Sequence, residues 1–369
     1  QAYGSQRFNF VRGLTADNTY ANRNTSSFSV GANLSLPIFQ GLRAVRQLSY
    51  SRTALKATLE QVEAAKDDVT LNVISQYLQA LYASEMLQVA RVNLGISQSE
   101  LDRRQALLDA GRLPGLDIHE ARAQVAQDEL SVTNAVNDSI IARLDLAQLL
   151  NLPDAEGFDI APLGDDERLL PSPDDVFANA LQYNHTMRAG RLQEEAAEKN
   201  VALAKTGYIP TLSFSAGLGT NYYKTSGFDN EGFGAQMRHN FAKSIGFSLS
   251  IPIFDAFSTR NNVRRARAQQ ESIRLQLDDA RNRLYKAIVQ AHTQAVGAIK
   301  KQESARIAVE SSEAAFEAMK VKYDNGRANA TEFQKAQSNY INSQAQAVQA
   351  KYERILRARI LDFYNTQTL

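Results

Sequence analysis

The most constraining feature of this sequence is an internal repeat in which two landmarks keep the same separation. The segment beginning at Leu34 reads LSLPIFQG, and the segment beginning at Leu249, 215 positions later, reads LSIPIFDA. Downstream, the DAGR that begins at Asp109 is matched by the DNGR at Asp324, again 215 positions later. Because about 75 residues separate the landmarks in both copies, a rigid element of fixed length has to join them, and a long helix is the natural candidate.

The two copies differ at their beginnings. Residues 172–205 form a helical stretch before the strands of the second copy, whereas the first copy begins directly with strand-like sequence. The repeat therefore predicts that the helical counterpart of this stretch has been removed ahead of Gln1.

The segments between the landmarks have the composition of helices too long for a globule. Residues 41–108 and 257–323 contain no proline and almost no glycine, and each would measure roughly 100 Å as a helix. Leucine and alanine recur every seven residues from 277 to 298, which predicts a narrow seam of small side chains between neighbouring helices. Aromatic residues make up only 8% of the chain, which favours long, wetted helices over a compact core.

The helices that return from the landmarks, at about 116–150 and 330–365, are roughly half as long. In the second copy a helix at 184–205 can fill the other half, and the Pro-rich stretch 152–173 would cross the middle. The turns carry Gly111 and Gly326 as C-terminal stops, followed by Asp117 and Thr331 near the next helix N-termini.

Three short runs, at 26–38, 210–222 and 244–253, alternate between apolar and small polar residues with a period of two. Each is long enough to cross lipid as a tilted strand. The predicted lipid-facing side chains are those of Phe28, Val30, Leu34, Leu212, Phe214, Ile245, Phe247 and Leu249. The opposite faces carry Ser, Gly, Thr and Asn rather than the Lys, Glu and Arg of a wet soluble sheet, which favours a barrel wall over a soluble sandwich. The opening run at 3–12 alternates less cleanly, and we assign it as a strand because the second copy has a pair there.

Several classes of function find no support in the sequence. The net charge of +1, from 41 basic and 40 acidic residues, indicates no nucleic-acid partner. The chain has no cysteine, its four histidines are scattered, and it contains no HExxH, GxGxxG, Walker or GxSxG motif. The acidic run at 165–167 lies in Pro-rich sequence, which favours a solvated loop over a metal site. We therefore predict no catalytic activity, no cofactor and no metal.

No uncharged apolar run reaches 18 residues, so strands rather than helices would have to cross a membrane. Four strands cannot close around a lumen, and their edges must pair with other chains. Two or three copies would give 8 or 12 strands.

On these features the chain resembles the TolC-like outer-membrane efflux proteins over essentially its whole length, apart from the first helix. The resemblance is carried by the LSLPIF and LSIPIF junctions, the YIPTL at Tyr208 and the AGR and NGR turns. It implies an α+β membrane protein: a homotrimer whose protomers each give four strands to one transmembrane β-barrel, continued by a long α-helical tunnel through the periplasm. It also implies a passive exit channel of a tripartite efflux or type I secretion system, bounded by outer-membrane lipid and served by a periplasmic adaptor protein and an inner-membrane transporter.

In that family the tunnel tip is the gate, closed by hydrogen bonds and ion pairs between helices and opened by the adaptor. Tyr323 matches the family's tip tyrosine, Gly326 its turn glycine, and Glu332 a lumen-facing acidic position, whereas a second acidic position falls at Lys335 and departs from the pattern. The predicted gate or adaptor contacts are Asp109, Gly111, Arg112, Tyr323, Asp324, Gly326, Arg327 and Glu332. The alternative for each charged residue is a solvated helix cap.

The predicted division of the chain follows the repeat. It comprises a first strand pair (1–40), a first long helical hairpin (41–151), an equatorial linker (152–183), a half-length helix (184–206), a second strand pair (207–255) and a second long hairpin (256–369). The rival hypothesis is a soluble periplasmic coiled-coil adaptor, which would also contain long hairpins, but whose β parts should expose charged faces.

Overall fold

The computed structural model describes residues 2–14, 20–111, 115–152, 158, 160–161, 170–226 and 228–366, with the backbone alone at 11–14, 20–23 and 116. The chain divides into two compact units. One comprises residues 1–56 and 192–275, and the other comprises residues 57–191 and 276–369.

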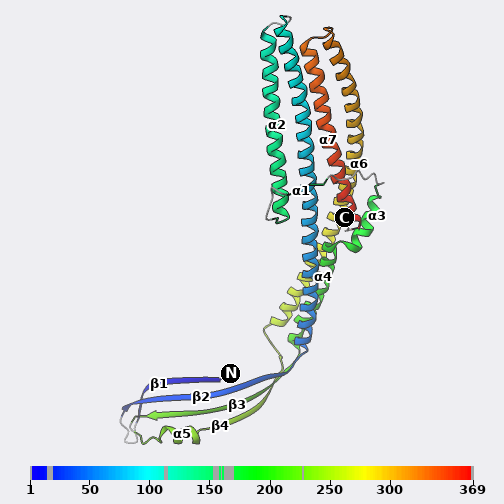
Figure 1. The fold of residues 1–369 in the computed structure, drawn as a ribbon. Coiled ribbons are helices and arrows are strands. Elements are labelled where there is room, and N and C mark those ends of the chain that lie inside the picture. Colours follow the sequence, from blue (N-terminus) through cyan, green and yellow to red (C-terminus); the bar gives the residue numbers. More distant parts are fainter. Residues whose placement is uncertain are drawn as a thin grey trace. The chain divides into compact units, whose positions relative to one another are not determined.

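The first unit contains one antiparallel sheet of four strands in the order β1-β2-β3-β4 (Figure 1). The strands are β1 (Ala2–Leu14), β2 (Tyr20–Gln40), β3 (Thr211–Thr225) and β4 (Ala242–Ser250). The predicted strands are confirmed, including the opening run with its weaker alternation, although the last strand ends at Ser250 and not at 253. That run pairs with β2 along its whole length, from Ala2 opposite Ala32 to Leu14 opposite Tyr20.

The register gathers the apolar residues on one face of this sheet, since directly opposite residues of an antiparallel pair share a face. The aligned apolar pairs are Phe28 with Tyr222, Leu34 with Ala216, Leu36 with Phe214, Phe214 with Phe247, Ala216 with Ile245 and Leu212 with Leu249. The other face is a continuous surface of small polar residues, with rows such as Asn33, Gly217 and Ser244 or Ser35, Ser215 and Gly246. The side chains of Ile245 and Phe247 are 76% and 69% exposed, so this chain alone leaves the apolar face largely uncovered.

The turns from strand to helix lie four residues or more beyond Pro37 and Pro252. Pro37 is still paired with Ser213 inside β2, and a bulge follows between Pro37 and Phe39. The chain turns at Gly41 and Leu42 in one copy and at Ala256 and Phe257 in the other, and all four residues have positive φ. At Gly41 a β-carbon would come within 2.6 Å of Ile209, so glycine meets both a conformational and a packing requirement there.

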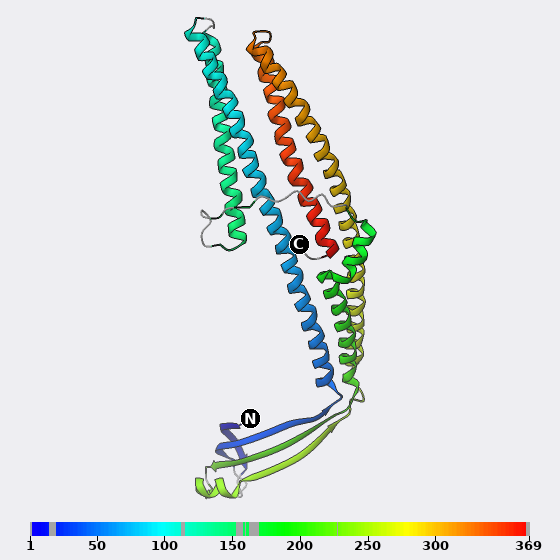
Figure 2. The ribbon, with the colours of Figure 1, turned by 45° about the vertical axis from the view of Figure 1, so that its right-hand side comes forward.

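The predicted helices are confirmed, and the two long ones have equal length. Helix α1 (Arg43–Asp109) and helix α6 (Ser258–Asp324) each contain 67 residues. Within the second unit, α2 (Gly115–Leu149) runs back beside α1, and α7 (Ala330–Thr366) runs back beside α6 (Figure 2). The shorter elements are α3 (Pro173–Tyr183), α4 (His185–Ala204), the 3-10 turn η1 (Lys205–Tyr208) and α5 (Phe233–His239). Among the described helices, none carries an apolar stretch of the length that a membrane span requires.

The cores of the second unit are small and lie between helices. One cluster joins α3, α6 and α7 through Val176, Ile288 and Leu361, all fully buried. A second joins α1 and α2 through Ala80 and Leu146. Alanines predicted on the seam of α6, such as Ala291 and Ala298, are buried, which allows the neighbouring helices to approach closely.

Both hairpin turns use the predicted glycines. Gly111 has φ +70° and Gly326 has φ +68°, the left-handed conformation that ends a helix at little cost for glycine. The cap of α7 is not Thr331, as expected from the sequence, but Asn329. Its side chain accepts from the Glu332 amide at 2.9 Å, while the Glu332 carboxylate accepts from the Asn329 amide at 3.1 Å, a reciprocal capping box.

Candidate gate at the turns of the helical hairpins

The residues predicted for the gate do not all take part in one arrangement. Glu332 is engaged in the capping box of its own helix, and Asp109 accepts from Gln105 of its own helix at 2.9 Å. Arg327 is exposed, and its guanidinium contacts no partner among the described residues. Arg112 lies outside the described residues. Among the described residues, these three side chains make no contact with the other hairpin, whereas Tyr323 and Asp324 do.

Tyr323 joins the two hairpins through its phenol. The hydroxyl of this α6 residue donates to Oε1 of Glu100 on α1 at 2.6 Å. Because Glu100 comes from the first repeat and Tyr323 from the second, the hydrogen bond connects the two copies near their turns.

Two arginines on the next turn of α1 surround the same pair. The guanidinium of Arg103 lies 4.4 Å from the centroid of the Tyr323 ring and donates to the Tyr323 carbonyl at 3.3 Å. It also forms an ion pair with Asp324 at 3.4 Å. Arg104 donates to Glu100 at 2.8 Å and to the backbone carbonyl of Asp117 on α2 at 3.1 Å. We call Glu100, Arg103, Arg104, Tyr323 and Asp324 the tip cluster.

The tip cluster is partly withdrawn from water. Arg104 is only 2% exposed, and charge-assisted hydrogen bonds are stronger there than on the surface. Burial raises the pKa of Tyr323, and the hydrogen bond to Glu100 and its negative charge raise it further. The phenol therefore stays protonated and keeps donating through neutral pH.

An aromatic stack supports Tyr323 from inside the second hairpin. Its ring stacks on Phe333 of α7 at 4.8 Å, Phe333 contacts Phe316 of α6 at 5.6 Å, and Phe316 stacks on Tyr340 of α7 at 5.5 Å. The four rings alternate between the two helices, so the orientation of Tyr323 is fixed by packing as well as by its hydrogen bond.

A buried carboxylate joins three helices next to the tip cluster. Asp128 on α2 is 4% exposed and accepts hydrogen bonds from Asn93 at 2.9 Å, from Gln124 at 3.0 Å and from Ser97. Gln337 of α7 donates in turn to Asn93 at 2.9 Å and Ser97 at 3.3 Å. The charge is therefore fully solvated by protein donors, as a buried carboxylate requires.

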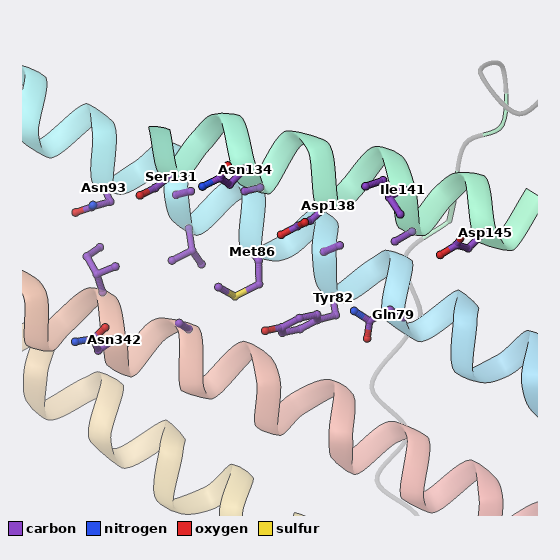
Figure 3. A pocket seen from close by; sticks show the side chains of 17 residues that line it. Gln79, Tyr82, Met86, Asn93, Ser131, Asn134, Asp138, Ile141, Asp145 and Asn342 are labelled. Atoms are coloured by element: carbon purple, nitrogen blue, oxygen red, sulfur yellow. The ribbon is translucent and has the colours of Figure 1, made fainter. Parts of the chain in front are cut away.

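Beside this network, a groove of about 780 Å³ runs between α2 and α7, with α1 at its floor (Figure 3). Small residues, including Ala83, Ala90 and Ala135, line it. Asn134, Asp138 and Asp145 lie along its α2 wall (Figure 3). The groove therefore combines an acidic wall with small side chains.

Glu100, Arg103 and Arg104 were not predicted from the sequence, because they lie two to three helical turns before Gly111 and not in the turn itself. A signal was present in the repeat. The second copy carries Ala315, Ala318 and Met319 at the corresponding positions, so the charged group occurs in one copy only.

This architecture has clear counterparts. The model of a family described as "Outer membrane efflux protein" matches residues 8–152 and 176–363. The chain belongs to the outer membrane efflux protein family. The resemblance drawn from the repeat is thereby confirmed, and the protein is a bacterial outer-membrane protein with its helical part in the periplasm. The family is one of transport proteins rather than enzymes.

Relatives of this efflux protein are distant but extensive in coverage. The outer membrane protein TolC of Vibrio cholerae is 23% identical over 346 residues, which cover 91% of this chain and 76% of the relative. The outer membrane efflux protein BepC of Brucella suis is 21% identical over 355 residues, which cover 96% of this chain and 74% of the relative.

Solved structures show the same fold at low identity. The CmeC outer membrane channel of Campylobacter jejuni superposes with a TM-score of 0.76 at 15% identity, covering 99% of this chain and 77% of that one. The outer membrane protein VceC of Vibrio cholerae superposes with a TM-score of 0.72 at 16% identity, covering 100% of this chain and 86% of that one.

Proposed function

We propose that three copies of this efflux protein form a passive exit channel. Each copy gives its four strands to a shared twelve-stranded barrel in the outer membrane, and the helices continue that barrel as a periplasmic tunnel. An inner-membrane transporter supplies the energy and hands cargo over through a periplasmic adaptor protein, so the chain itself carries out no reaction.

The observation that carries this proposal is the two-faced sheet with two free edges. One face presents large apolar side chains such as Leu34, Phe247 and Leu249, and the other presents serine, glycine and asparagine. Among the described strands, β1 and β4 each leave an outer edge unpaired. A closed barrel of several copies places the apolar face against lipid, the small polar face around a wide aqueous lumen, and each free edge against a neighbour.

Aromatic residues at both ends of the apolar face support a membrane setting. Phe8, Phe10 and Phe28 share this face at one end through the β1–β2 register. At the other end Phe39 pairs with Leu212, and Phe254, which is 75% exposed, follows the end of β4. Two aromatic girdles separated by an apolar band are typical of strands that cross the outer membrane.

We further propose that the tip cluster holds the tunnel closed. Tyr323, Asp324, Glu100 and Arg103 join α6 to α1 by contacts that a modest rotation of the second hairpin would break. The groove beside Asp138 and Asp145 is the site that we propose for a helix of the adaptor, since binding there would favour separation of α7 from α2.

The test is conductance of the purified oligomer in planar bilayers, together with its mass by light scattering in detergent. We expect a trimer with small conductance, and a larger conductance when the tip cluster is broken by Glu100→Ala. A chain that stays monomeric and dissolved without detergent would overturn the channel proposal. A trimer whose conductance does not respond to Glu100→Ala would overturn the gate alone.

A further inference from the structure

Strand β3 extends beyond its outer neighbour, and the extension is not left open. The pairing with β4 stops at Gly219 opposite Ala242, whereas β3 continues to Thr225. Six residues of β3 thus have β2 on one side and no strand on the other. A strand edge of this kind would ordinarily be a template for any other strand.

Side-chain amides occupy this edge in place of a strand. The Tyr223 amide donates to Oε1 of Gln236 at 3.0 Å, and Nε2 of Gln236 donates to the Tyr223 carbonyl at 2.9 Å. The Thr225 amide and carbonyl bond in the same two-way manner to Asn230, at 3.0 and 2.9 Å.

A third side-chain amide makes only one of the two hydrogen bonds. Nδ2 of Asn240 donates to the Asn221 carbonyl at 2.7 Å. A primary amide has the donor and acceptor of a peptide group, so three amides spaced along the edge take the place of alternate residues of a paired strand. We call Asn230, Gln236 and Asn240 the edge cap.

The edge cap is held firmly in place. Gln236 is 5% exposed and also donates to the Glu231 carbonyl at 2.8 Å. On the same short helix, Phe233 reaches over the apolar face of the sheet and contacts Tyr222 at 5.1 Å and Phe28 at 6.2 Å. Helix α5 therefore covers both the open edge of β3, through Gln236, and part of the apolar face of the sheet, through Phe233.

We infer that the edge cap restricts the pairing of this chain with a second copy of itself to the nine residues of β4. The inference rests on the shared barrel proposed above. In such a barrel the free edge of β1 from one copy meets the β4 side of the next, and β1 has 13 residues against 9 in β4. Without the cap, the residues of β1 that extend past the end of β4 could turn into the vacant place beside β3, pair with Asn221, Tyr223 and Thr225 and so shift the register between copies. The cap removes that alternative register by satisfying the same backbone groups within the chain.

Disulfide trapping tests this directly, because the chain has no cysteine of its own. Ser5→Cys or Asn9→Cys on β1 is combined in turn with Ser244→Cys or Ser248→Cys on β4, and with Asn221→Cys or Tyr223→Cys on the capped edge. All these positions lie on the small-residue face. Within one copy, three strand spacings of about 4.8 Å separate β1 from β4 and two separate β1 from β3. Both separations are too large for an internal disulfide, so every crosslink from β1 to either strand reports two copies.

Without the triple substitution, we expect oxidation to crosslink the β1 cysteines of one copy to the β4 cysteines of another. Crosslinking to cysteines at Asn221 or Tyr223 should stay at the level of an uncrosslinked control. In the variant Asn230→Ala, Gln236→Ala, Asn240→Ala we expect crosslinking at those two positions to rise roughly tenfold, because the freed backbone groups seek new partners. Arg238→Ala, an exposed change on the same helix, serves as the matched control and should leave the pattern of the parent.

Crosslinking of Asn221 or Tyr223 to β1 in the parent would overturn the inference, and this arm does not depend on how well the triple variant folds. An unchanged pattern in a triple variant that still assembles would overturn it as well. In both cases a conducting trimer would leave the proposed channel intact, whereas a parent that forms no oligomer would overturn the two proposals together.

Discussion

The two hairpins have nearly the same backbone but different side chains at their turns. Helices α1 and α6 have 67 residues each, and the turn glycines have φ values of +70° and +68°. The side chains that form the aromatic stack of the second hairpin are nevertheless replaced by aliphatic side chains at the corresponding positions of the first. The residues at corresponding positions are Leu101 and Phe316, Leu108 and Tyr323, Ile118 and Phe333, and Val125 and Tyr340.

The charges show the opposite distribution. Glu100, Arg103 and Arg104 occur in the first hairpin, where the second has two alanines and a methionine, and the buried Asp128 corresponds to Ser343. The contact between the hairpins therefore pairs a phenol from one copy with a charged group from the other. A duplicated scaffold has become a two-part contact because its copies diverged in complementary directions, and neither copy could form the contact with a second version of itself.

The largest expected effect comes from the carboxylate that only the first hairpin carries. Asp128→Ala removes the acceptor of Asn93, Ser97 and Gln124 and leaves these donors in a buried site, which should cost roughly 3 kcal/mol of local stability. Hydrogen exchange by mass spectrometry should show protection of the 93–104 segment falling about a hundredfold.

Ser343→Ala is the matched control for this prediction, since the Ser343 hydroxyl donates to the Asn339 carbonyl of its own helix and has no other partner in the part of the chain that the structure describes. It should change stability by less than about 0.5 kcal/mol. Equal effects of the two substitutions would mean that the buried network does not distinguish the hairpins.

The next effect concerns the contact itself. Glu100→Ala removes the acceptor of Tyr323 and a partner of both arginines, which should weaken the closed tip by about 2 kcal/mol and raise the open population roughly thirtyfold. Tyr323→Phe should have a smaller effect, and the double variant should resemble Glu100→Ala, because both changes break one hydrogen bond. Single-channel conductance measures all three.

Asp109→Ala provides the comparison within the first hairpin, because among the described residues the Asp109 carboxylate accepts a hydrogen bond from Gln105 of its own helix and from no other side chain. Its conductance should match that of the parent. Additive effects of Glu100→Ala and Tyr323→Phe would contradict a direct coupling of the two side chains.

Much of this architecture could be predicted from the sequence, for reasons visible in particular residues. Period-two alternation identified three of the four strands, and the repeat supplied the fourth. The fixed spacing of 215 residues identified helices of equal length, because a regular element keeps its length in both copies. Gly111 and Gly326 were predicted as stops since their conformation depends on few neighbours.

The tip cluster and the edge cap could not be predicted in the same way. Glu100 and Tyr323 are 223 positions apart, and Gln236 contacts Tyr223 through a loop with no periodicity. Asn329 was missed as a cap because Thr331, two positions later, is an equally plausible cap by residue type, and only the backbone decides between them. Contacts made by single polar side chains across the fold leave no periodic trace.

A smaller effect is expected when the aromatic stack is made aliphatic like its counterpart. Phe333→Ile introduces the residue type found at Ile118 and removes the ring that supports Tyr323, at a cost of about 1 kcal/mol. Hydrogen exchange in residues 326–340 should accelerate about fivefold. Lys335→Ala, an exposed change on the same helix turn, is the control and should leave the exchange rates unaltered. An equal acceleration in Lys335→Ala would mean that the aromatic stack does not stabilise this segment.

The smallest expected effect is a pH dependence of the conductance, which arises from the titration of Tyr323 in the second hairpin. The pKa of Tyr323 is raised, first by burial and then by Glu100, so its stabilisation of the closed tip is complete below the unfolded tyrosine pKa of about 10 and is lost as pH rises through the folded value. Conductance should therefore be flat between about pH 6 and 9 and increase only above about pH 10.

Tyr323→Phe should abolish this alkaline increase, whereas Tyr340→Phe should retain it. The pKa of Tyr340 is also raised by burial, but its hydroxyl bonds to Glu313 within the second hairpin. The two tyrosines thus occupy one aromatic stack and titrate in the same direction, yet only one of them reaches the first hairpin. An alkaline increase that survives Tyr323→Phe would mean that the stability of the second hairpin, rather than its contact with the first, controls the tip.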